Sequence, residues 1–332
     1  MDRYRRPALL ASALLFVLLC VTAASLLASG GDGDDANSGP AVVVQKTVEP
    51  ILADLPPLPT PEPLPPLGSP LPPFWTEAPS LKPGAPQPPE IAAIAAVIVD
   101  EASGAVLYDK NAHMSAAPAS LTKIATLVLA LEDGRLDEVV ETDVDSASMR
   151  GSTIMGLEPG DRFSLRDLLY GMMLPSGNDA ALAVGRFVAG NDEAFVKKMN
   201  LLMRRLGLTE TTWTNPHGLD RGGNHMTSAY DLAMVSRYGM SLPGFREIVN
   251  ARSYAASGSR TIPLVNINSF INLYPGADGI KTGYTRRAGS TLAASATKRG
   301  QRLYAVVLNS GTREIDAQRL LDWAFASYIW QQ

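Results

Sequence analysis

Prolines crowd the segment from Asp54 to Pro89, and this limits which parts of the chain can belong to a folded domain. Proline fixes the backbone near polyproline II geometry and has no N–H, so such a segment sustains neither a helix nor an internal strand. It forms a semi-rigid spacer of about 3.1 Å per residue. We therefore predict a Pro-rich, disordered linker over residues 31–90 and one folded domain over residues 91–332. A ligand for proline-recognition domains is the alternative interpretation of the linker.

The first thirty residues contain an uncharged apolar stretch from Ala8 to Ala28. A helix over this stretch, at about 1.5 Å per residue, spans the roughly 30 Å hydrocarbon layer of a membrane. Basic residues precede it and acidic residues follow it, namely Arg3, Arg5 and Arg6 before and Asp32, Asp34 and Asp35 after. This asymmetry predicts a single-pass membrane anchor at residues 1–30, with the rest of the chain extracytoplasmic. The alternatives are a cleaved signal peptide, which gives a secreted protein, and a lipidated Cys20, which Leu19 disfavours.

The charge balance and the single cysteine exclude several classes of function. Lysine and arginine total 29 against 33 acidic residues, so no basic field is available for nucleic acid, and we expect no nucleic-acid partner. The only cysteine, Cys20, lies in the apolar stretch, which excludes a disulfide framework and a thiol nucleophile. The sequence has no His-Glu-x-x-His zinc motif, and we expect neither a metal nor a cofactor. Catalysis would then use oxygen and nitrogen groups.

The folded part begins and ends with strands and has helices between them. Strands are predicted at Ala95–Asp100, Ala105–Asp109, Gly279–Tyr284, Ser290–Thr297 and Leu303–Asn309. Helices are predicted at Leu121–Glu132, Leu165–Met173, Asp179–Val188, Asp192–Leu206, Ala229–Tyr238 and, at the end of the chain, Ile315–Trp330. Strands from both ends suggest one sheet assembled from distant segments, in an α/β (α+β) domain of about 240 residues.

The first motif that carries chemistry is Ser120-Leu-Thr-Lys123, at the start of a predicted helix. A spacing of three residues puts both side chains on one helix face, where a lysine that has lost its proton can act as the base for a serine nucleophile. Burial and a second cation would lower the lysine pKa enough for this role. An N-capping serine with a surface lysine is the plainer interpretation. Ser295 and Lys298 match the same pattern, but on a strand they face opposite ways, so we discard that pair.

The second motif is Ser176-Gly-Asn178, in a turn between two predicted helices. Residues two apart can point the same way into a cleft, where a hydroxyl relays a proton and an amide holds a peptide group. Alone, the tripeptide is also an ordinary turn or helix cap.

The third motif is Lys281-Thr282-Gly283, which lies on a predicted strand and is followed by Tyr284. The cation can bind a carboxylate, the Thr282 hydroxyl can add to that contact, and the glycine lets a substrate backbone lie against the strand as an added β-segment. The plainer interpretation is a strand glycine that marks a bulge.

The order Ser-x-x-Lys, Ser-x-Asn, Lys-Thr-Gly is the signature of penicillin-binding proteins and serine β-lactamases. The stretches Thr214–Leu219 and Met226–Leu232 further resemble the low-molecular-mass D-alanyl-D-alanine carboxypeptidases, peptidase family S11. The resemblance covers roughly Ile91 to Trp330. It implies the serine β-lactamase/D,D-peptidase-like fold, an antiparallel sheet flanked by helices with a helical subdomain. It also implies peptidoglycan stem peptides as substrates and β-lactam antibiotics as covalent inhibitors.

The resemblance assigns roles to the motif residues. Ser120 would attack the carbonyl between two D-alanines and form an acyl-enzyme, with Lys123 as its base. Ser176 and Asn178 would complete the proton relay and hold substrate, and water would later release the shortened peptide.

The resemblance also assigns roles to the third motif. Lys281 and Thr282 would recognise the terminal carboxylate, and the backbone N–H groups of Ser120 and Tyr284 would form the oxyanion hole. The family often has histidine at the position of Tyr284, so we expect a changed specificity with activity retained.

Many relatives continue into a small β-rich domain and a C-terminal anchor, whereas this sequence stops at Gln332, which suggests anchoring through the N-terminus.

Three other functions compete with this interpretation. A β-lactamase of class A needs a Glu-x-x-Leu-Asn sequence, and Glu193, Glu210 and Glu247, the only glutamates between the second and third motifs, do not lie in one. A D,D-endopeptidase of the same fold and a non-catalytic wall-binding scaffold are the others.

A histidine-based serine hydrolase is disfavoured. The sequence has no Gly-x-Ser-x-Gly, and the three histidines, His113, His217 and His225, are predicted at turn or surface positions.

Overall fold

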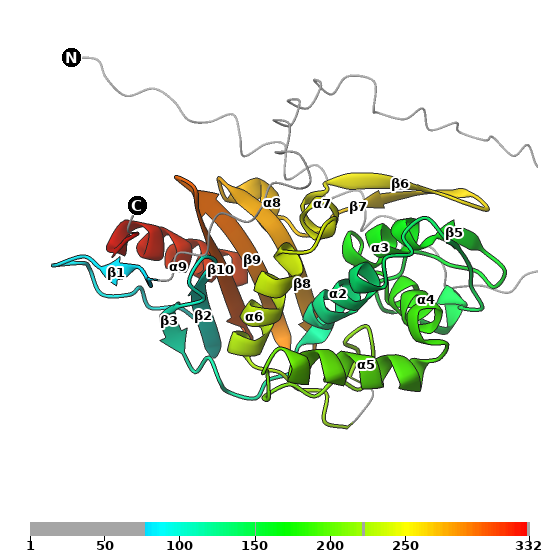
Figure 1. The fold of residues 1–332 in the computed structure, drawn as a ribbon, viewed down its shortest axis with the longest axis horizontal. Helices are drawn as coiled ribbons and strands as arrows, with labels where there is room; N and C mark the ends of the chain where they lie inside the picture. Colours follow the sequence, from blue (N-terminus) through cyan, green and yellow to red (C-terminus); the bar gives the residue numbers. More distant parts are fainter. Residues whose placement is uncertain (1–76, 150, 221–222, 331–332) are drawn as a thin grey trace, which may run out of the picture. The chain divides into compact units, whose positions relative to one another are not determined.

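A five-stranded antiparallel sheet, in the order β3-β2-β10-β9-β8, is the centre of the fold (Figure 1). The computed structural model describes residues 77–149, 151–220 and 223–330. The strands of the sheet are β2 Ala95–Asp100, β3 Val106–Lys110, β8 Ala277–Thr285, β9 Gly289–Lys298 and β10 Gln301–Leu308. They come from the two ends of the folded part, as predicted, and one of the two edge strands is β8, which carries the third motif.

Alternate residues of the inner strands enter two separate hydrophobic cores. Val97 and Val99 of β2 pack on the side of the α6 helix, whereas Ala96 and Ile98 pack on the side of the α9 helix. This alternation follows from the two-residue period of a strand. Because both faces are covered, β2 is buried along its whole length, which explains the apolar run from Ala95 to Val99 that precedes Asp100.

The helices divide between the two faces of the sheet and a helical region beyond β8 (Figure 1). The helical elements are η1 Ala119–Thr122, α2 Lys123–Asp133, η2 Ser146–Met149, α3 Leu165–Met173, α4 Asn178–Ala189, α5 Asp192–Arg205, α6 Ala229–Met240, α7 Phe245–Asn250, α8 Phe270–Leu273 and α9 Arg313–Ser327. Their ends follow local sequence signals. Ser164 and Asp167 form a capping box at the start of α3, and Gly134 ends α2 in the left-handed conformation that glycine adopts at low cost. The predicted antiparallel sheet with a helical subdomain is confirmed.

Short strand pairs that the sequence pattern does not indicate complete the fold. They are β4 Val139–Glu141 with β5 Arg162–Ser164, β6 Ser253–Ser257 with β7 Thr261–Val265, and β1 Ser80–Leu81 with β11 Tyr328–Ile329. The last pair shortens the predicted terminal helix, which ends at Ser327 and not at Trp330. The reason is a partner that lies far away in sequence, since residues 80–81 supply the backbone groups that residues 328–329 bind.

The segment assigned to the linker enters the described structure before the predicted boundary at residue 91. Lys82 donates from its backbone N–H to Ser327 O and from its Nζ to Ala326 O. Trp323 likewise donates to Pro86 O. The predicted anchor at residues 1–30 and the linker up to residue 76 lie outside the described residues. Within the described part, no helix has the length and apolar character that crossing a membrane requires.

Candidate active site

A cleft of about 480 Å³ beside β8 contains residues from all three motifs. Its lining includes Ser120, Ser176, Asn178, Thr282, Gly283 and Tyr284. The two motif lysines are buried next to it, since Lys123 is 0% exposed and Lys281 1% exposed. The structure thus brings together the eight residues that the sequence predicts as a site.

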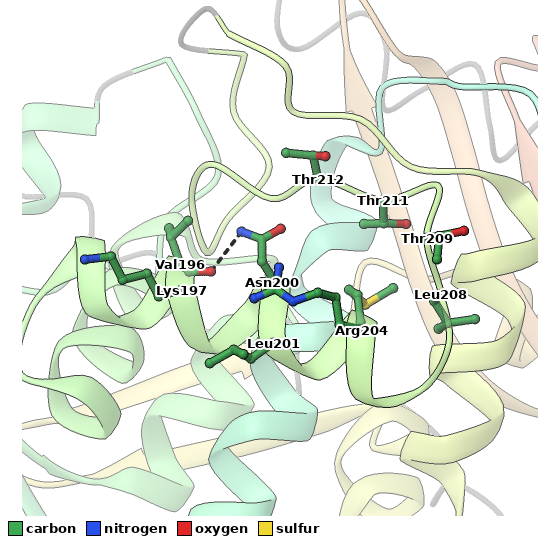
Figure 2. Close-up of a pocket in the computed structure, with 10 residues that line it drawn as sticks. Val196, Lys197, Asn200, Leu201, Arg204, Leu208, Thr209, Thr211 and Thr212 are labelled. Carbon is green, nitrogen blue, oxygen red and sulfur yellow. Dashed lines mark hydrogen bonds between the residues drawn. The ribbon is translucent and has the colours of Figure 1, made fainter.

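A second hollow, of about 710 Å³, runs along α5 and contains none of these residues (Figure 2). Its polar side chains include Lys197 and Arg204, and Asn200 uses its amide to bind Val196 O within the helix. Volume therefore does not identify the site, whereas the grouping of reactive side chains does.

Lys123 connects the first motif to the second. Its Nζ lies 3.1 Å from Ser120 Oγ, 2.6 Å from Asn178 Oδ1 and 2.9 Å from His217 O. Ser120 lies in the 3₁₀ turn η1, and Lys123 is the first residue of α2. The predicted pairing across one helical turn is present, but the first part of that turn is tighter than an α-helix.

The surroundings of Lys123 favour its uncharged form. Burial lowers its pKa well below the usual value, and the nearby charge of Lys281 lowers it further, while Asp179 opposes them. The pKa of Lys281 is itself lowered to about 7, first by burial and then by Arg313. Two buried amines close together disfavour each other's protonation. This is the condition under which a lysine can accept a proton from serine at neutral pH.

The second motif is held in a restrained backbone conformation. Ser176 has a φ of +66°, in the left-handed region that costs a residue with a side chain about 1 kcal/mol. Its carbonyl accepts a bond of 2.8 Å from Thr153 Oγ1, and the N–H of Asn178 donates to Thr153 O at 2.9 Å. Asn178 then begins α4, which fixes its amide toward Lys123.

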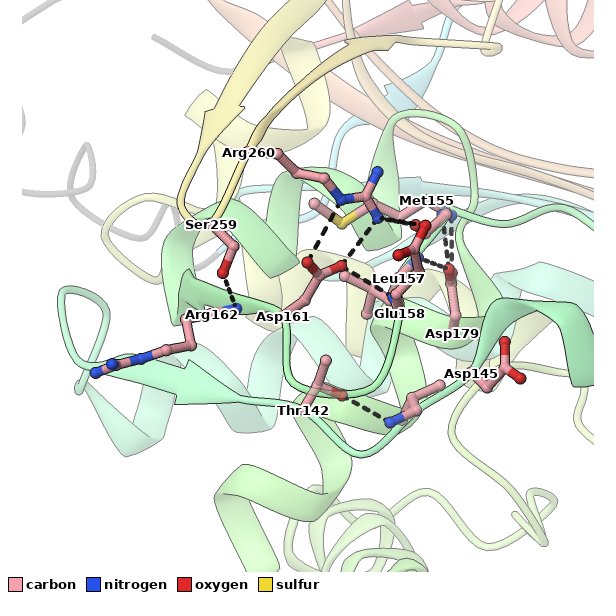
Figure 3. A network of polar contacts seen from close by, with 12 residues as sticks. Thr142, Asp145, Met155, Leu157, Glu158, Asp161, Arg162, Asp179, Ser259 and Arg260 are labelled. Carbon is pink, nitrogen blue, oxygen red and sulfur yellow. Dashed lines mark hydrogen bonds and ion pairs between the residues drawn. The ribbon is translucent and has the colours of Figure 1, made fainter.

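Asp179 anchors the loop that forms one wall of the cleft (Figure 3). Its buried carboxylate accepts backbone N–H bonds of 2.7–2.9 Å from Met155, Gly156 and Leu157. The same loop supplies Thr153 to the lining of the cleft. The residue that follows the Ser-Gly-Asn motif therefore shapes the site without entering it.

Asp179→Asn should reduce both the stability of the domain and the reactivity of the cleft. One acceptor oxygen becomes an NH₂ group that faces backbone donors, so we expect a loss of about 2–3 kcal/mol in the free energy of unfolding. Urea unfolding measures this loss, and the acylation rate by penicillin reports on the wall of the cleft. Asp145→Asn is the matched control, because this exposed aspartate accepts one N–H, from Ala147, outside the cleft. Equal stabilities of the two variants would contradict the anchoring role.

The third motif presents its backbone and one hydroxyl to the cleft. Thr282 and Gly283 line it, and the ring of Tyr284 stands at its mouth, 67% exposed. A Cβ atom at Gly283 would lie 2.9 Å from the backbone N of Ser120. The strand thus passes directly beside the backbone amide of Ser120, and only glycine allows this approach.

Arg313 is a cation of the cleft that the sequence pattern does not reveal. It lies at the first turn of α9, lines the cleft and donates a bond of 2.9 Å to Gly283 O. Arg286 is the other cation in the lining. Lys281, by contrast, is covered and donates to Thr282 O at 3.0 Å. No local motif surrounds Arg313, and only the packing of α9 against the sheet brings it to the site.

The histidines partly differ from expectation. His113 is exposed and pairs with Glu210, and His217 lies in a turn, where its carbonyl accepts the Lys123 bond. The surface prediction is wrong for His225, whose side chain is 1% exposed. Two isolated β-bridges, Ala116 to Thr227 and Thr212 to Met226, hold its segment against the domain, and its ring lies 5.4 Å from that of the buried Trp213.

The chemical groups in the lining of the cleft include no carboxylate. Glu193 pairs with Lys197 on α5, Glu210 pairs with His113, and Glu247 accepts a bond from Tyr170, all outside the lining. In the described ranges of the chain, no three His, Cys, Asp or Glu side chains are grouped so that they could hold a metal ion. The described site therefore consists of several hydroxyls, two buried amines and surrounding amide and guanidinium groups.

Comparison with known proteins agrees with this geometry. Residues 82–312 match the model of the Peptidase S11 family, described as D-alanyl-D-alanine carboxypeptidase. The D-alanyl-D-alanine carboxypeptidase DacF of Bacillus subtilis is 41% identical over 246 residues, which are 71% of this chain and 63% of DacF. The chain thus spans somewhat less than two thirds of the length of that relative.

Solved structures give the same result. Penicillin binding protein 6B of Escherichia coli has a TM-score of 0.67 and 38% identity, over 73% of this chain and 80% of that one. The Streptomyces K15 DD-transpeptidase has a TM-score of 0.68 and 31% identity, over 72% of this chain and 99% of that one. The chain therefore belongs to the D-alanyl-D-alanine carboxypeptidase family, peptidase family S11.

Proposed function

We propose that the protein is a serine D-Ala-D-Ala carboxypeptidase that removes the terminal D-alanine of peptidoglycan stem peptides through an acyl-enzyme on Ser120. The observation that carries this proposal is the position of Lys123 Nζ, buried and 3.1 Å from Ser120 Oγ at the floor of a cleft bordered by an edge strand. An extended peptide can add to such an edge through its main chain.

The hydrogen bonds of Lys123 support its role as the base. An uncharged amine has two N–H groups and one lone pair. Asn178 Oδ1 and His217 O are acceptors only, so they take the two N–H groups. The lone pair is then left for the hydroxyl of Ser120, and this is the arrangement needed to remove its proton during attack.

The leaving D-alanine needs a proton on its nitrogen and a partner for its carboxylate. Ser176 lines the cleft and can relay the proton taken by Lys123. For the carboxylate we propose Thr282 and Arg313, because both face the cleft whereas Lys281 is covered. In this proposal Lys281 acts mainly through its charge, which lowers the pKa of Lys123.

The experiment that tests the proposal is mass spectrometry of a synthetic pentapeptide ending in D-Ala-D-Ala after incubation with the purified full chain. Loss of one alanine is the expected result. The same peptide with an amidated C-terminus is the control, and it should be trimmed much more slowly because it lacks the carboxylate. Penicillin should give a long-lived adduct of the antibiotic with Ser120.

Other outcomes would identify the competing functions. Rapid turnover of penicillin would show a β-lactamase, and cleavage of cross-linked dimers with an intact pentapeptide would show an endopeptidase. Absence of both product and adduct would leave a wall-binding scaffold.

We also propose that residues 1–30 hold the protein at the cell membrane, with the domain outside the cell. If these residues are cleaved, the protein is secreted. Fractionation of cells that express the full chain tests this proposal.

Lys281→Met should move the acid limb of the acylation rate to higher pH. Lys123 acts as base only without its proton, so the rate rises as pH increases through its pKa. Removing the neighbouring charge removes a repulsion that lowers this pKa, and the pKa therefore rises. The measurement is the acylation rate by penicillin from about pH 5 to about pH 9. Lys298→Met is the control, since Lys298 pairs with Asp322 at the far end of β9. If the acid limb of the acylation rate lay at the same pH in Lys281→Met as in the wild type, the coupling would be contradicted.

A further inference from the structure

A chain of buried hydrogen bonds ends on the residue before the nucleophile. Thr122 Oγ1 lies 2.9 Å from Ala119 O and 2.9 Å from Nε2 of His225. His225 Nδ1 in turn lies 2.9 Å from the backbone N of Thr214. The side chains of Thr122 and His225 are 0% and 1% exposed, so these bonds do not compete with water.

The direction of each bond in this chain follows from the groups involved. The N–H of Thr214 can only donate, so Nδ1 of His225 is the acceptor and carries no proton. The ring proton is then on Nε2, which donates to Thr122 Oγ1. The hydroxyl proton of Thr122 is left for Ala119 O. Burial lowers the pKa of His225 to about 4, so the ring is uncharged at neutral pH, and the bond from Thr214 fixes its tautomer.

The carbonyl at the end of the chain is held in an unusual conformation. Ala119 has a φ of +50°, which costs a residue with a Cβ about 1–2 kcal/mol. A Cβ at Gly218 would lie 1.8 Å from Ala119 O, so the backbone of the 217–218 turn packs directly on this carbonyl. The surrounding structure thus holds the Ala119–Ser120 peptide unit in a position that the isolated turn would not favour.

The orientation of this peptide unit decides where the N–H of Ser120 points. In a trans peptide unit the C=O and N–H groups point in opposite directions within one plane. Ala119 O points to Thr122, so the Ser120 N–H points the other way. On that other side lies Gly283, whose ideal Cβ position is 2.9 Å from Ser120 N. This N–H is one of the two donors expected in the oxyanion hole.

We propose that Thr122 and His225 are positioning residues that aim the Ser120 N–H at the oxyanion by holding the carbonyl on the opposite side of the same peptide unit. The proposal rests on the proposed function, because the oxyanion forms only if Ser120 is acylated. It gives Thr122, the third residue of the Ser-Leu-Thr-Lys motif, a role beyond the spacing between Ser120 and Lys123. The role is specific to the transition state, since the charge on the oxyanion develops only there.

Thr122→Val tests the proposal, because it keeps the shape of the side chain and removes the hydroxyl. We expect kcat for the pentapeptide to fall about 10- to 100-fold, less than the cost of deleting an oxyanion-hole donor, with KM changed less than about twofold. Thr122→Ser keeps the hydroxyl and should restore kcat. His225→Phe should have a smaller effect than Thr122→Val, and the double variant should lose no more than Thr122→Val alone, since both act through one bond.

A control separates positioning from simple loss of stability. Ser236→Ala removes another fully buried hydroxyl that donates to a backbone carbonyl, Leu232 O at 2.7 Å, in α6. It should lower the melting temperature to a similar extent and leave kcat unchanged. Folded Thr122→Val with the kcat of the wild type would overturn the positioning role alone. Wild-type protein that neither trims the pentapeptide nor forms a penicillin adduct would overturn the proposed function instead.

Discussion

Ser120→Ala should abolish covalent labelling by fluorescent penicillin and lower kcat for the pentapeptide by about 10⁴-fold or more. Among the described residues that contact Lys123 Nζ, Ser120 alone has a group that can attack a carbonyl, since the other two contacts are the amide oxygen of Asn178 and a backbone carbonyl. Removing it leaves the amine without a nucleophile to activate. Intact-protein mass spectrometry would show the wild type heavier by the mass of the antibiotic and the variant unchanged.

The sequence provides a matched control for this variant. Ser295 is the other serine of a Ser-x-x-Lys pattern, and it is buried in β9, where it donates a bond of 2.6 Å to Asp278. Lys298, three residues later, pairs with Asp322 and lies away from Ser295. Ser295→Ala should therefore still be labelled fully. Labelling of Ser120→Ala at the wild-type level would contradict the acyl-enzyme.

Gly283→Ala should lower both kcat and the acylation rate by about 10²–10³-fold in a protein that still folds. The added Cβ would lie 2.6 Å from Thr291 Oγ1, 2.9 Å from Ser120 N and 3.0 Å from Ala119 Cβ. Such contacts require β8 and the η1 turn to move apart. The oxyanion hole and the edge on which a substrate would lie share this contact, so a small displacement disturbs both.

Two further variants locate the cause. Gly311→Ala is the control, since a Cβ there meets no atom within 4 Å. Gly283→Ala combined with Thr291→Ala removes the nearest neighbour and leaves the backbone of Ser120 in place, so no recovery of the acylation rate is expected. Full recovery in the double variant would show that the contact with Thr291 alone caused the loss. Steady-state kinetics with the pentapeptide and penicillin labelling measure all three variants.

The local grouping of the motif side chains could be predicted because each motif is local. Ser120 and Lys123 are three residues apart, Ser176 and Asn178 two apart, and the third motif lies on one strand. Backbone geometry alone decides that such pairs share a face. The alternation that fills the two cores, the glycine that ends α2 and the capping box that begins α3 are local for the same reason.

The accessibility of the charged groups could not be predicted in this way. Lys281 and Arg313 are both basic residues of the site, yet the first is covered and the second faces the cleft. A sequence shows the charge of a side chain, whereas its exposure depends on which distant elements pack over it. His225 is buried and not at the surface for the same reason, since bridges to residues 116 and 212 hold its segment against the domain.

The sequence by itself determined which hydroxyl, amines and amide are available and on which local elements they lie. Only the tertiary structure decided that these groups meet and which of them are buried. Lys123 bonds to Asn178 and His217, which are 55 and 94 positions away along the chain, and Thr122 bonds to His225 at a distance of 103 positions. Burial lowers the pKa of Lys123, and hydrogen bonds orient the Ser120 amide, only when segments remote in sequence pack together. In an unpacked chain, water would solvate the amine and compete for these hydrogen bonds.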